Sequence, residues 1–91
     1  MRRLIWSTDA IGDLRASRSD IAESNPAAAS RVAAALMGAA NGLTAFPDRG
    51  RPVRPGVREL TTVRPYVIRY AVLAEEIRVT SIRHSARRPA P

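Results

Sequence analysis

The stretch from Val57 to His84 constrains the fold of this chain more than any other, because β-branched and aromatic residues dominate it. Pro65 stands where a strand begins, and the run Ala74–Glu76 separates two long extended segments as a hairpin turn does. These signals predict three antiparallel strands, at about residues 57–62, 65–73 and 76–83. A short sheet with an apolar face is not stable alone, so we expect the preceding residues to form helices that cover one face.

Alternation along the second of these strands assigns its side chains to two faces of the sheet. One face receives Tyr66, Ile68, Tyr70 and Val72, and the other receives Val67, Arg69, Ala71 and Leu73. The apolar character of the first set predicts that both tyrosines belong to the core. In the last strand the alternation shifts at Ser81 and Ile82, which predicts a β-bulge.

The N-terminal half predicts a short strand at residues 2–6 and two helices. Ser7 is a suitable N-cap for a first helix over residues 8–23. The apolar stripe of this helix consists of Ala10, Ile11, Leu14, Ile21 and Ala22, and Ser17 weakens it in the middle. Asn25 and Pro26 then supply the cap and the first residue of a second helix, over residues 26–41.

The second helix is unusually poor in charge. Its core face is predicted by the helical spacing of Val32, Leu36, Ala39 and Leu43. From Pro26 to Pro47 the only charged residue is Arg31, whereas a helix lying on a sheet normally has a charged outer face. Either alanine serves as a helix former on a solvated face, or the small residues form a surface onto which another chain packs, and we favour the second interpretation. The run is not a membrane span, because it is alanine-rich, contains Arg31 and is interrupted at Gly42.

Residues 43–56 are rich in Pro, Gly and Arg and are predicted to form a loop, which Phe46 is expected to anchor to the core. Its arginines suit either a solvated linker or a rim that faces phosphate groups. We expect a single domain over residues 1–91, with residues 84–91 as a flexible basic tail.

The net charge of +7 is unevenly distributed. Residues 1–48 contain five arginines and five acidic residues, whereas residues 49–91 contain ten arginines and three glutamates. This asymmetry indicates a polyanionic or acidic partner. All basic residues are arginines, which suits bidentate contacts with phosphate or carboxylate, although codon usage in a GC-rich genome gives the same composition.

The composition also excludes several classes of site. The chain has no cysteine and one histidine, so we expect no metal site, and no motif indicates a cofactor. The apolar run near the N-terminus is too short for a signal peptide, so we expect a cytoplasmic protein without a membrane span.

Several distinct short motifs follow one another along the chain: Arg3–Ser7, Ala10–Leu14, Ile21–Glu23 before Asn25–Ala29, Leu43 with Phe46–Pro47, Gly50–Pro52, Gly56–Leu60, Pro65–Tyr70 and Ile82–His84. In order and spacing they resemble the ParE/RelE superfamily of toxins from type II toxin-antitoxin systems, over nearly the whole chain. The resemblance implies an α+β fold of order β-α-α-β-β-β, in which a helical hairpin packs on one face of an antiparallel sheet. Ser17 and Asp20 depart from the family pattern, which has apolar or aromatic residues at these positions.

The resemblance also implies a cognate antitoxin and a hetero-oligomeric complex with it. In ParE-like members a C-terminal segment of a ParD-like antitoxin wraps the toxin and places a helix against the helical hairpin. The implied antitoxin-binding candidates are Leu14, Ile21, Ala28, Val32, Ala33, Leu36, Met37 and Ala40.

Two functional classes share this family. RelE-like members are ribosome-dependent mRNA nucleases, and for that chemistry the candidate residues are Glu59, Arg69, Arg83 and His84. ParE-like members inhibit DNA gyrase without catalysis. The second class is favoured because Val67 occupies a position where the nucleases have an arginine, and because no aromatic residue follows Tyr70.

The candidate catalytic residues also have simpler interpretations. A glutamate next to an arginine, as in Arg58-Glu59, more often forms a structural ion pair than a catalytic base, and His84 is expected to hydrogen-bond locally at the end of its strand. We therefore predict no catalytic site. The candidates for target binding are Arg58, Arg69, Arg83, His84, Arg87 and Arg88. A third class, a simple basic nucleic-acid-binding domain, lacks an aromatic platform and a recognition helix here.

Overall fold

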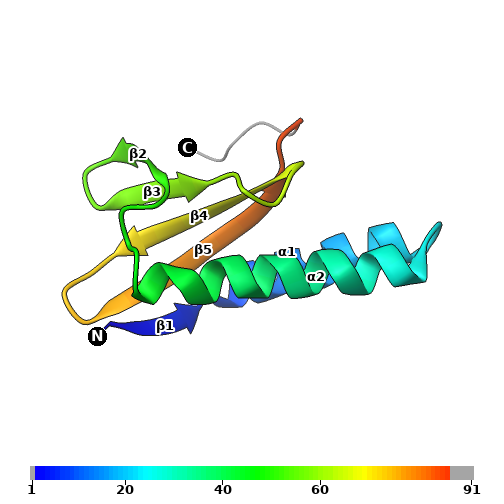
Figure 1. The fold of residues 1–91 in the computed structure, drawn as a ribbon, viewed down its shortest axis with the longest axis horizontal. Helices are drawn as coiled ribbons and strands as arrows, with labels where there is room; N and C mark the ends of the chain where they lie inside the picture. Colours follow the sequence, from blue (N-terminus) through cyan, green and yellow to red (C-terminus); the bar gives the residue numbers. More distant parts are fainter. Residues whose placement is uncertain (1, 87–91) are drawn as a thin grey trace.

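The computed structural model describes residues 2–86 and has the predicted α+β architecture. The elements in chain order are β1 (Arg3–Trp6), α1 (Thr8–Ala22), α2 (Pro26–Asn41), a short 3-10 helix (Gly42–Thr44), β2 (Arg51–Arg54), β3 (Val57–Leu60), β4 (Tyr66–Val72) and β5 (Glu76–His84) (Figure 1). The strands form one five-stranded sheet in the order β1-β5-β4-β3-β2. β1 pairs with β5 in parallel, and the other neighbours are antiparallel.

One strand, β2, lies inside the segment that was predicted to be a loop. It pairs with β3, so that Arg51 lies opposite Glu59, and Gly56 closes the hairpin between them with a φ of 78°. Pro52 is tolerated because β2 is an edge strand, where a missing N–H faces no neighbour. The prediction was wrong because all four residues of β2 are exposed and carry no alternating apolar pattern.

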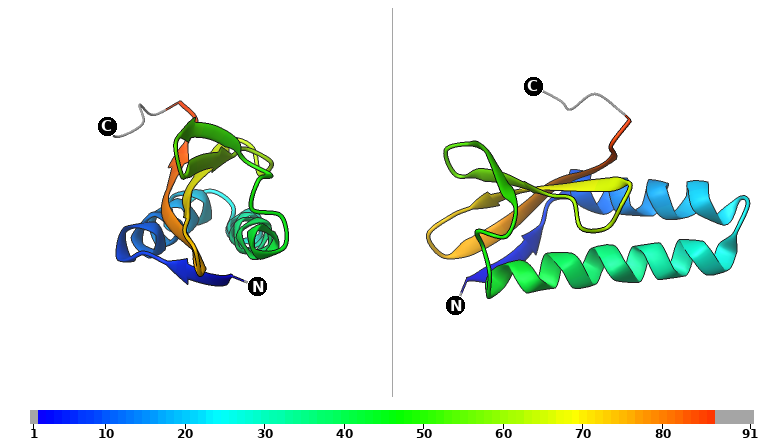
Figure 2. Two further views of the ribbon diagram at one scale, coloured as in Figure 1. Left: turned by 90° about the vertical axis from the view of Figure 1, so that its left-hand side faces the viewer. Right: turned by 45° about the horizontal axis from the view of Figure 1, so that its top comes forward.

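The two helices begin at the predicted caps. The Ser7 side chain accepts a hydrogen bond from the backbone N–H of Ala10, and the Asn25 side chain accepts one from Ala28. α1 and α2 lie side by side as a hairpin, and the turn between them projects beyond the end of the sheet (Figure 2).

The core lies between this hairpin and one face of the sheet, here called the covered face. Its sheet residues include Ile68, Tyr70, Ile77, Val79 and Ile82, and its helix residues include Ala10, Leu36 and Ala40. Both Tyr66 and Tyr70 belong to it, as predicted. The predicted bulge is also present, because Arg69 pairs with Ser81 while Tyr70 pairs with Val79, which leaves Thr80 unmatched.

Phe46 does not anchor the 43–56 segment, because its side chain is exposed. The anchor is Tyr70, which is fully buried. Its hydroxyl accepts a hydrogen bond from the Gly50 N–H (2.9 Å) and donates one to the Pro47 carbonyl (2.7 Å). Burial raises the pKa of Tyr70 above its ordinary value, more than the Gly50 N–H lowers it, so the hydroxyl remains a donor at neutral pH.

α1 is fixed to the sheet through a polar contact at the edge of β5. β1 pairs with β5 only as far as Val79, and α1 continues along the same edge. There the Asp13 carboxylate accepts a hydrogen bond from the backbone N–H of Ile82 (2.9 Å). The helix thus satisfies an edge N–H that would otherwise have no strand partner.

Candidate functional site

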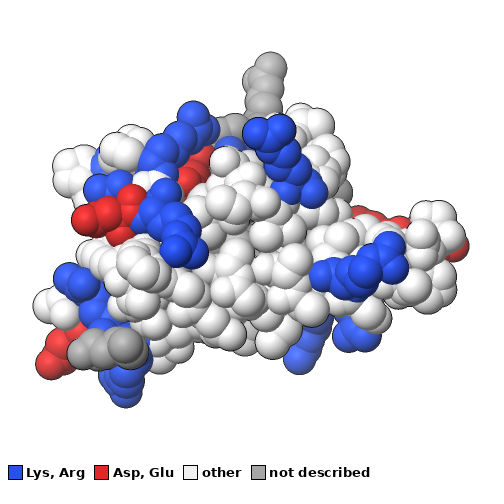
Figure 3. Space-filling view, viewed as in Figure 1, with Lys and Arg blue, Asp and Glu red and all other residues white. Residues whose placement is uncertain are grey.

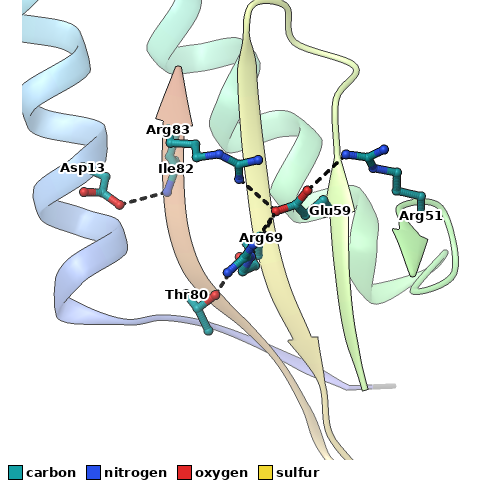
Figure 4. A network of polar contacts seen from close by, with 7 residues as sticks. All are labelled: Asp13, Arg51, Glu59, Arg69, Thr80, Ile82 and Arg83. Carbon is teal, nitrogen blue, oxygen red and sulfur yellow. Dashed lines mark hydrogen bonds and ion pairs between the residues drawn. The ribbon is translucent and has the colours of Figure 1, made fainter. Parts of the chain in front are cut away.

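The sheet face opposite the core, here called the open face, has a buried carboxylate at its centre. Glu59 in β3 is only 4% exposed, and its Oε2 accepts hydrogen bonds from Arg83 Nη1 (2.8 Å) and Arg69 Nε (3.0 Å) (Figure 4). Arg51 in β2 approaches the other oxygen at 3.4 Å and is itself largely exposed. Arginines from three different strands, β2, β4 and β5, therefore direct their guanidinium groups at one glutamate of β3.

This arrangement decides the protonation state of Glu59. Burial alone would raise the pKa of the carboxyl, but hydrogen bonds from Arg83 and Arg69, together with their positive charges, lower it below its ordinary value of 4.5. Glu59 is therefore ionised at neutral pH, and both lone-pair regions of its Oε2 are directed at cations. A carboxylate held in this way is a weak proton acceptor.

The structure separates the four residues considered for nuclease chemistry. Glu59, Arg69 and Arg83 meet on the open face, whereas His84 lies at the covered face. The His84 ring contacts Tyr66 edge-on, with ring centres 5.7 Å apart, and its Nδ1 accepts a hydrogen bond from the backbone N–H of Ala86. This local contact is the one expected from the sequence.

The ion pair expected between Glu59 and its neighbour Arg58 does not form, because adjacent residues of a strand point to opposite faces. Arg58 instead donates to the carbonyl of Gly50 (2.7 Å) and pairs with Asp48. Of the other target-binding candidates, Arg69 and Arg83 lie on the open face, and Arg87 and Arg88 lie outside the described residues.

Sequence reasoning missed two arginines of this face, Arg51 and Arg54, because they lie on the unpredicted strand β2. Arg54 and Arg69 line one side of a cleft of about 650 Å³, and Asp9 and Asp13 of α1 line the other. Its remaining lining residues are Thr8, Gly12, Val57, Ala71, Thr80 and Ser81. A partner segment in this cleft would meet opposite charges on its two sides. Residues three apart in a regular strand point to opposite faces, and the register shift between Pro52 and Arg54 brings both arginines to this one, so their spacing in the sequence gave no signal.

The predicted antitoxin-binding residues fall into two groups. Leu36 and Ala40 are fully buried in the core, so neither side chain is available to a partner, which corrects the expectation for these two. Leu14, Ile21 and Val32 pack against the core, Ala28 and Ala33 are half-buried, and Met37 is 50% exposed. The predicted set combined residues that face the core with residues that face solvent, because alanine occurs on both faces of the helix.

The outer face of α2 carries few charged groups. Exposed along it are Pro26, Ala27, Ser30, Arg31, Ala34, Ala35, Met37, Gly38 and Asn41, of which only Arg31 is charged. With α2 towards the viewer, this side of the molecule is largely white in Figure 3, and the arginines lie mostly around it. Among residues 2–86 no cluster of His, Asp and Glu could hold a metal ion, and no helix has the length and apolarity needed to cross a membrane.

Comparison with known proteins finds toxins of toxin-antitoxin systems. Residues 4–89 match the sequence model of the ParE toxin of the type II toxin-antitoxin system parDE. Toxin RelE2 of Caulobacter vibrioides is 42% identical over 87 residues, which cover 96% of this chain and 99% of the relative. Toxin RelE1 of the same organism is 40% identical over 67 residues, 70% of this chain and 72% of the relative. In a solved structure, the chromosomal ParDE toxin-antitoxin system from P. aeruginosa, a chain of 28% identity superposes with a TM-score of 0.81, covering 92% of this chain and 96% of that one.

Proposed function

Since this chain belongs to the ParE/RelE superfamily and is the toxin of a type II toxin-antitoxin system, we propose that it inhibits DNA gyrase through contact and has no catalytic site of its own. The observation that carries this proposal is the state of Glu59. The carboxylate is buried and ion-paired with Arg69 and Arg83, so it serves to position these arginines.

A nuclease that attacks through a ribose hydroxyl needs a proton acceptor and a proton donor near one phosphate. Here the one histidine lies on the other side of the sheet from Glu59, and Glu59 is held as an anion by two cations. The guanidinium groups of the open face can instead bind a phosphate or a carboxylate of the target, because arginine recognises both through paired N–H groups. Arg51 and Arg54 extend this surface to the edge of the sheet.

The antitoxin is proposed to be ParD-like and to cover α2. The exposed part of that helix is small, apolar and nearly uncharged, which is unfavourable for a permanently solvated face and suited to close helix packing. The charge of +7 makes an acidic antitoxin segment a matching partner for the rest of the surface.

Ribosome-dependent mRNA cleavage is the second candidate. It is favoured by one observation, that the two Caulobacter relatives carry the name RelE. In that case Arg69 and Arg83 would stabilise the charge on the scissile phosphate, and a group outside the Glu59 cluster would have to move the proton.

Induced expression in bacteria that lack the antitoxin tests the proposal. DNA breaks and induction of the DNA-damage response, with intact transcripts by primer extension, are the expected result. Cleaved transcripts with intact DNA would contradict gyrase inhibition and support the nuclease. Co-expression of the antitoxin should restore growth in either case.

A further inference from the structure

The segment between α2 and β2 is held rigidly although it has no regular structure. Tyr70 binds it from the core through Pro47 and Gly50. Arg58 binds it from β3, donating to the Gly50 carbonyl at 2.7 Å. Residue 50 has no space for a side chain, since a Cβ there would lie 2.7 Å from the Tyr70 hydroxyl. Three hydrogen bonds from two side chains, Tyr70 and Arg58, therefore fix the backbone of this loop.

The rigid loop presents an aromatic ring to solvent. Phe46 is 59% exposed, the most exposed of the large apolar side chains among residues 2–86. The guanidinium of Arg49 lies over its ring, 4.8 Å from the ring centre. Folding thus uses buried hydrogen bonds to hold a loop whose aromatic side chain contributes nothing to the core.

Arg49 connects this ring to the end of α2. A Cβ on Gly42, the C-cap of the helix, would lie 3.2 Å from Arg49 Nη1, so the guanidinium lies against the helix terminus. There its charge complements the negative end of the helix dipole. The backbone N–H of Phe46 also bonds to the Gly42 carbonyl. Phe46 and Arg49 therefore lie directly next to the C-terminal end of α2.

We propose that Phe46 and Arg49 form a preformed anchor site for the antitoxin, which receives an apolar side chain with a carboxylate next to it. This inference rests on the proposed function, because it extends the antitoxin surface from α2 to the loop that follows. The apolar side chain would pack on the exposed part of the Phe46 ring. The carboxylate would pair with Arg49, at the helix end where a positive charge is already held in place.

The chemistry of the site favours this occupant. Exposed aromatic and arginine side chains on a fixed backbone are the residues that carry most of the energy in protein interfaces, because little conformational entropy is lost when they are covered. β2 adds two further exposed positive charges, Arg51 and Arg54, on the open face, and the one acidic residue of the loop, Asp48, is paired with Arg58.

Binding of the cognate antitoxin to this chain tests the inference. We expect Phe46→Ala to raise the dissociation constant by about 30-fold or more, which is the loss of affinity typical of an interface hot spot. Arg49→Gln should raise the dissociation constant by about fivefold and make the affinity less dependent on salt. Leu73→Ala is the matched control, since Leu73 is another exposed apolar residue and lies in the β4-β5 turn. Circular dichroism should show that all three variants are folded.

The outcomes separate this inference from the proposed function. If the wild type binds the antitoxin and Phe46→Ala binds equally well, the anchor is wrong while the proposed function stands. Retained antitoxin binding with lost toxicity would assign Phe46 to the target and would also overturn the anchor. If the wild type does not bind the antitoxin, the proposed antitoxin surface on α2 and the anchor both fail, whereas gyrase inhibition is decided by the expression experiment.

Discussion

Arg83 and His84 are adjacent in β5 and serve opposite faces of the sheet. Arg83 directs its guanidinium to Glu59 on the open face, and His84 packs edge-on against Tyr66 at the covered face. Since consecutive strand residues point in opposite directions, no small rearrangement brings the imidazole to the Glu59 cluster. The two residues that a nuclease would need side by side are kept apart by the geometry of the strand.

Replacing Glu59 with Gln should strongly destabilise the protein. The substitution keeps the shape but removes the negative charge between Arg69 and Arg83, whose side chains are 12% and 16% exposed. Breaking a buried ion pair on one side costs about 3 kcal/mol or more of unfolding free energy. Urea unfolding measures this loss. Glu75→Gln, at an exposed turn position, is the control and should change stability by less than about 0.5 kcal/mol.

The same cluster predicts a pH dependence. The pKa of Glu59 is lower in the folded protein than its ordinary value of 4.5, so the unfolded chain binds the proton more readily. The stabilisation is therefore complete above that ordinary value and is lost as the pH falls through the lower, folded pKa. The stability difference between wild type and Glu59→Gln should shrink in acid, measured by thermal unfolding at several pH values. A difference that stays constant down to strong acid would contradict the ion-pair role.

Gly50→Ala tests the loop anchor at Tyr70. The added Cβ would lie 2.7 Å from the Tyr70 hydroxyl and 2.8 Å from the Glu59 carbonyl, so either the loop or the ring must move. We expect a loss of about 1–3 kcal/mol, as for other overpacked sites. The control is Gly38→Ala in α2, where nothing lies within 4 Å of the new Cβ and alanine should stabilise the helix by roughly 0.5–1 kcal/mol. Equal effects of the two substitutions would rule out the anchor.

Asp13 should govern how firmly α1 is held against β5. Asp13→Ala removes the acceptor for the Ile82 N–H and should cost about 1–2 kcal/mol. The amide of Ile82 should then exchange its hydrogen faster, which NMR can follow directly. Asp13→Asn retains an acceptor oxygen and should restore most of the protection. Slow exchange in the alanine variant would show that another group covers this amide.

Charges on the outer face of α2 should block the antitoxin without unfolding the toxin. Ala34 and Met37 are both exposed, so glutamate is tolerated there by the fold. We expect Ala34→Glu and Met37→Glu each to weaken antitoxin binding by about tenfold or more, because a buried unpaired charge is costly in an interface. Ala16→Glu, exposed on α1, is the matched control. Unchanged affinity in all three would mean that the antitoxin binds elsewhere.

The features that the sequence predicts well are local ones. Ser7 and Asn25 define the starts of both helices through hydrogen bonds within a few residues. Alternation along β4 assigned Tyr66 and Tyr70 to the core because each strand residue points opposite to the one before it. These signals need no knowledge of the neighbouring elements.

What the sequence did not reveal depends on contacts between distant segments. β2 is a strand because β3 pairs with it, and its exposed residues carry no pattern of their own. Phe46 was assigned to the core by its hydrophobicity, yet the buried anchor of its loop is Tyr70, 23 residues from Pro47. The Arg51 and Arg83 partners of Glu59 follow from the strand order, which no local pattern encodes.

The most direct test uses purified components. The toxin is added to DNA gyrase with ATP and relaxed plasmid, and in parallel to translating ribosomes with a defined mRNA. We expect loss of supercoiling and accumulation of cleaved DNA complexes, with the mRNA intact by primer extension. Arg54→Ala, at an exposed position of the open face, should weaken the inhibition without breaking the Glu59 ion pair. Unaffected gyrase together with cleaved mRNA would contradict a toxin without a catalytic site.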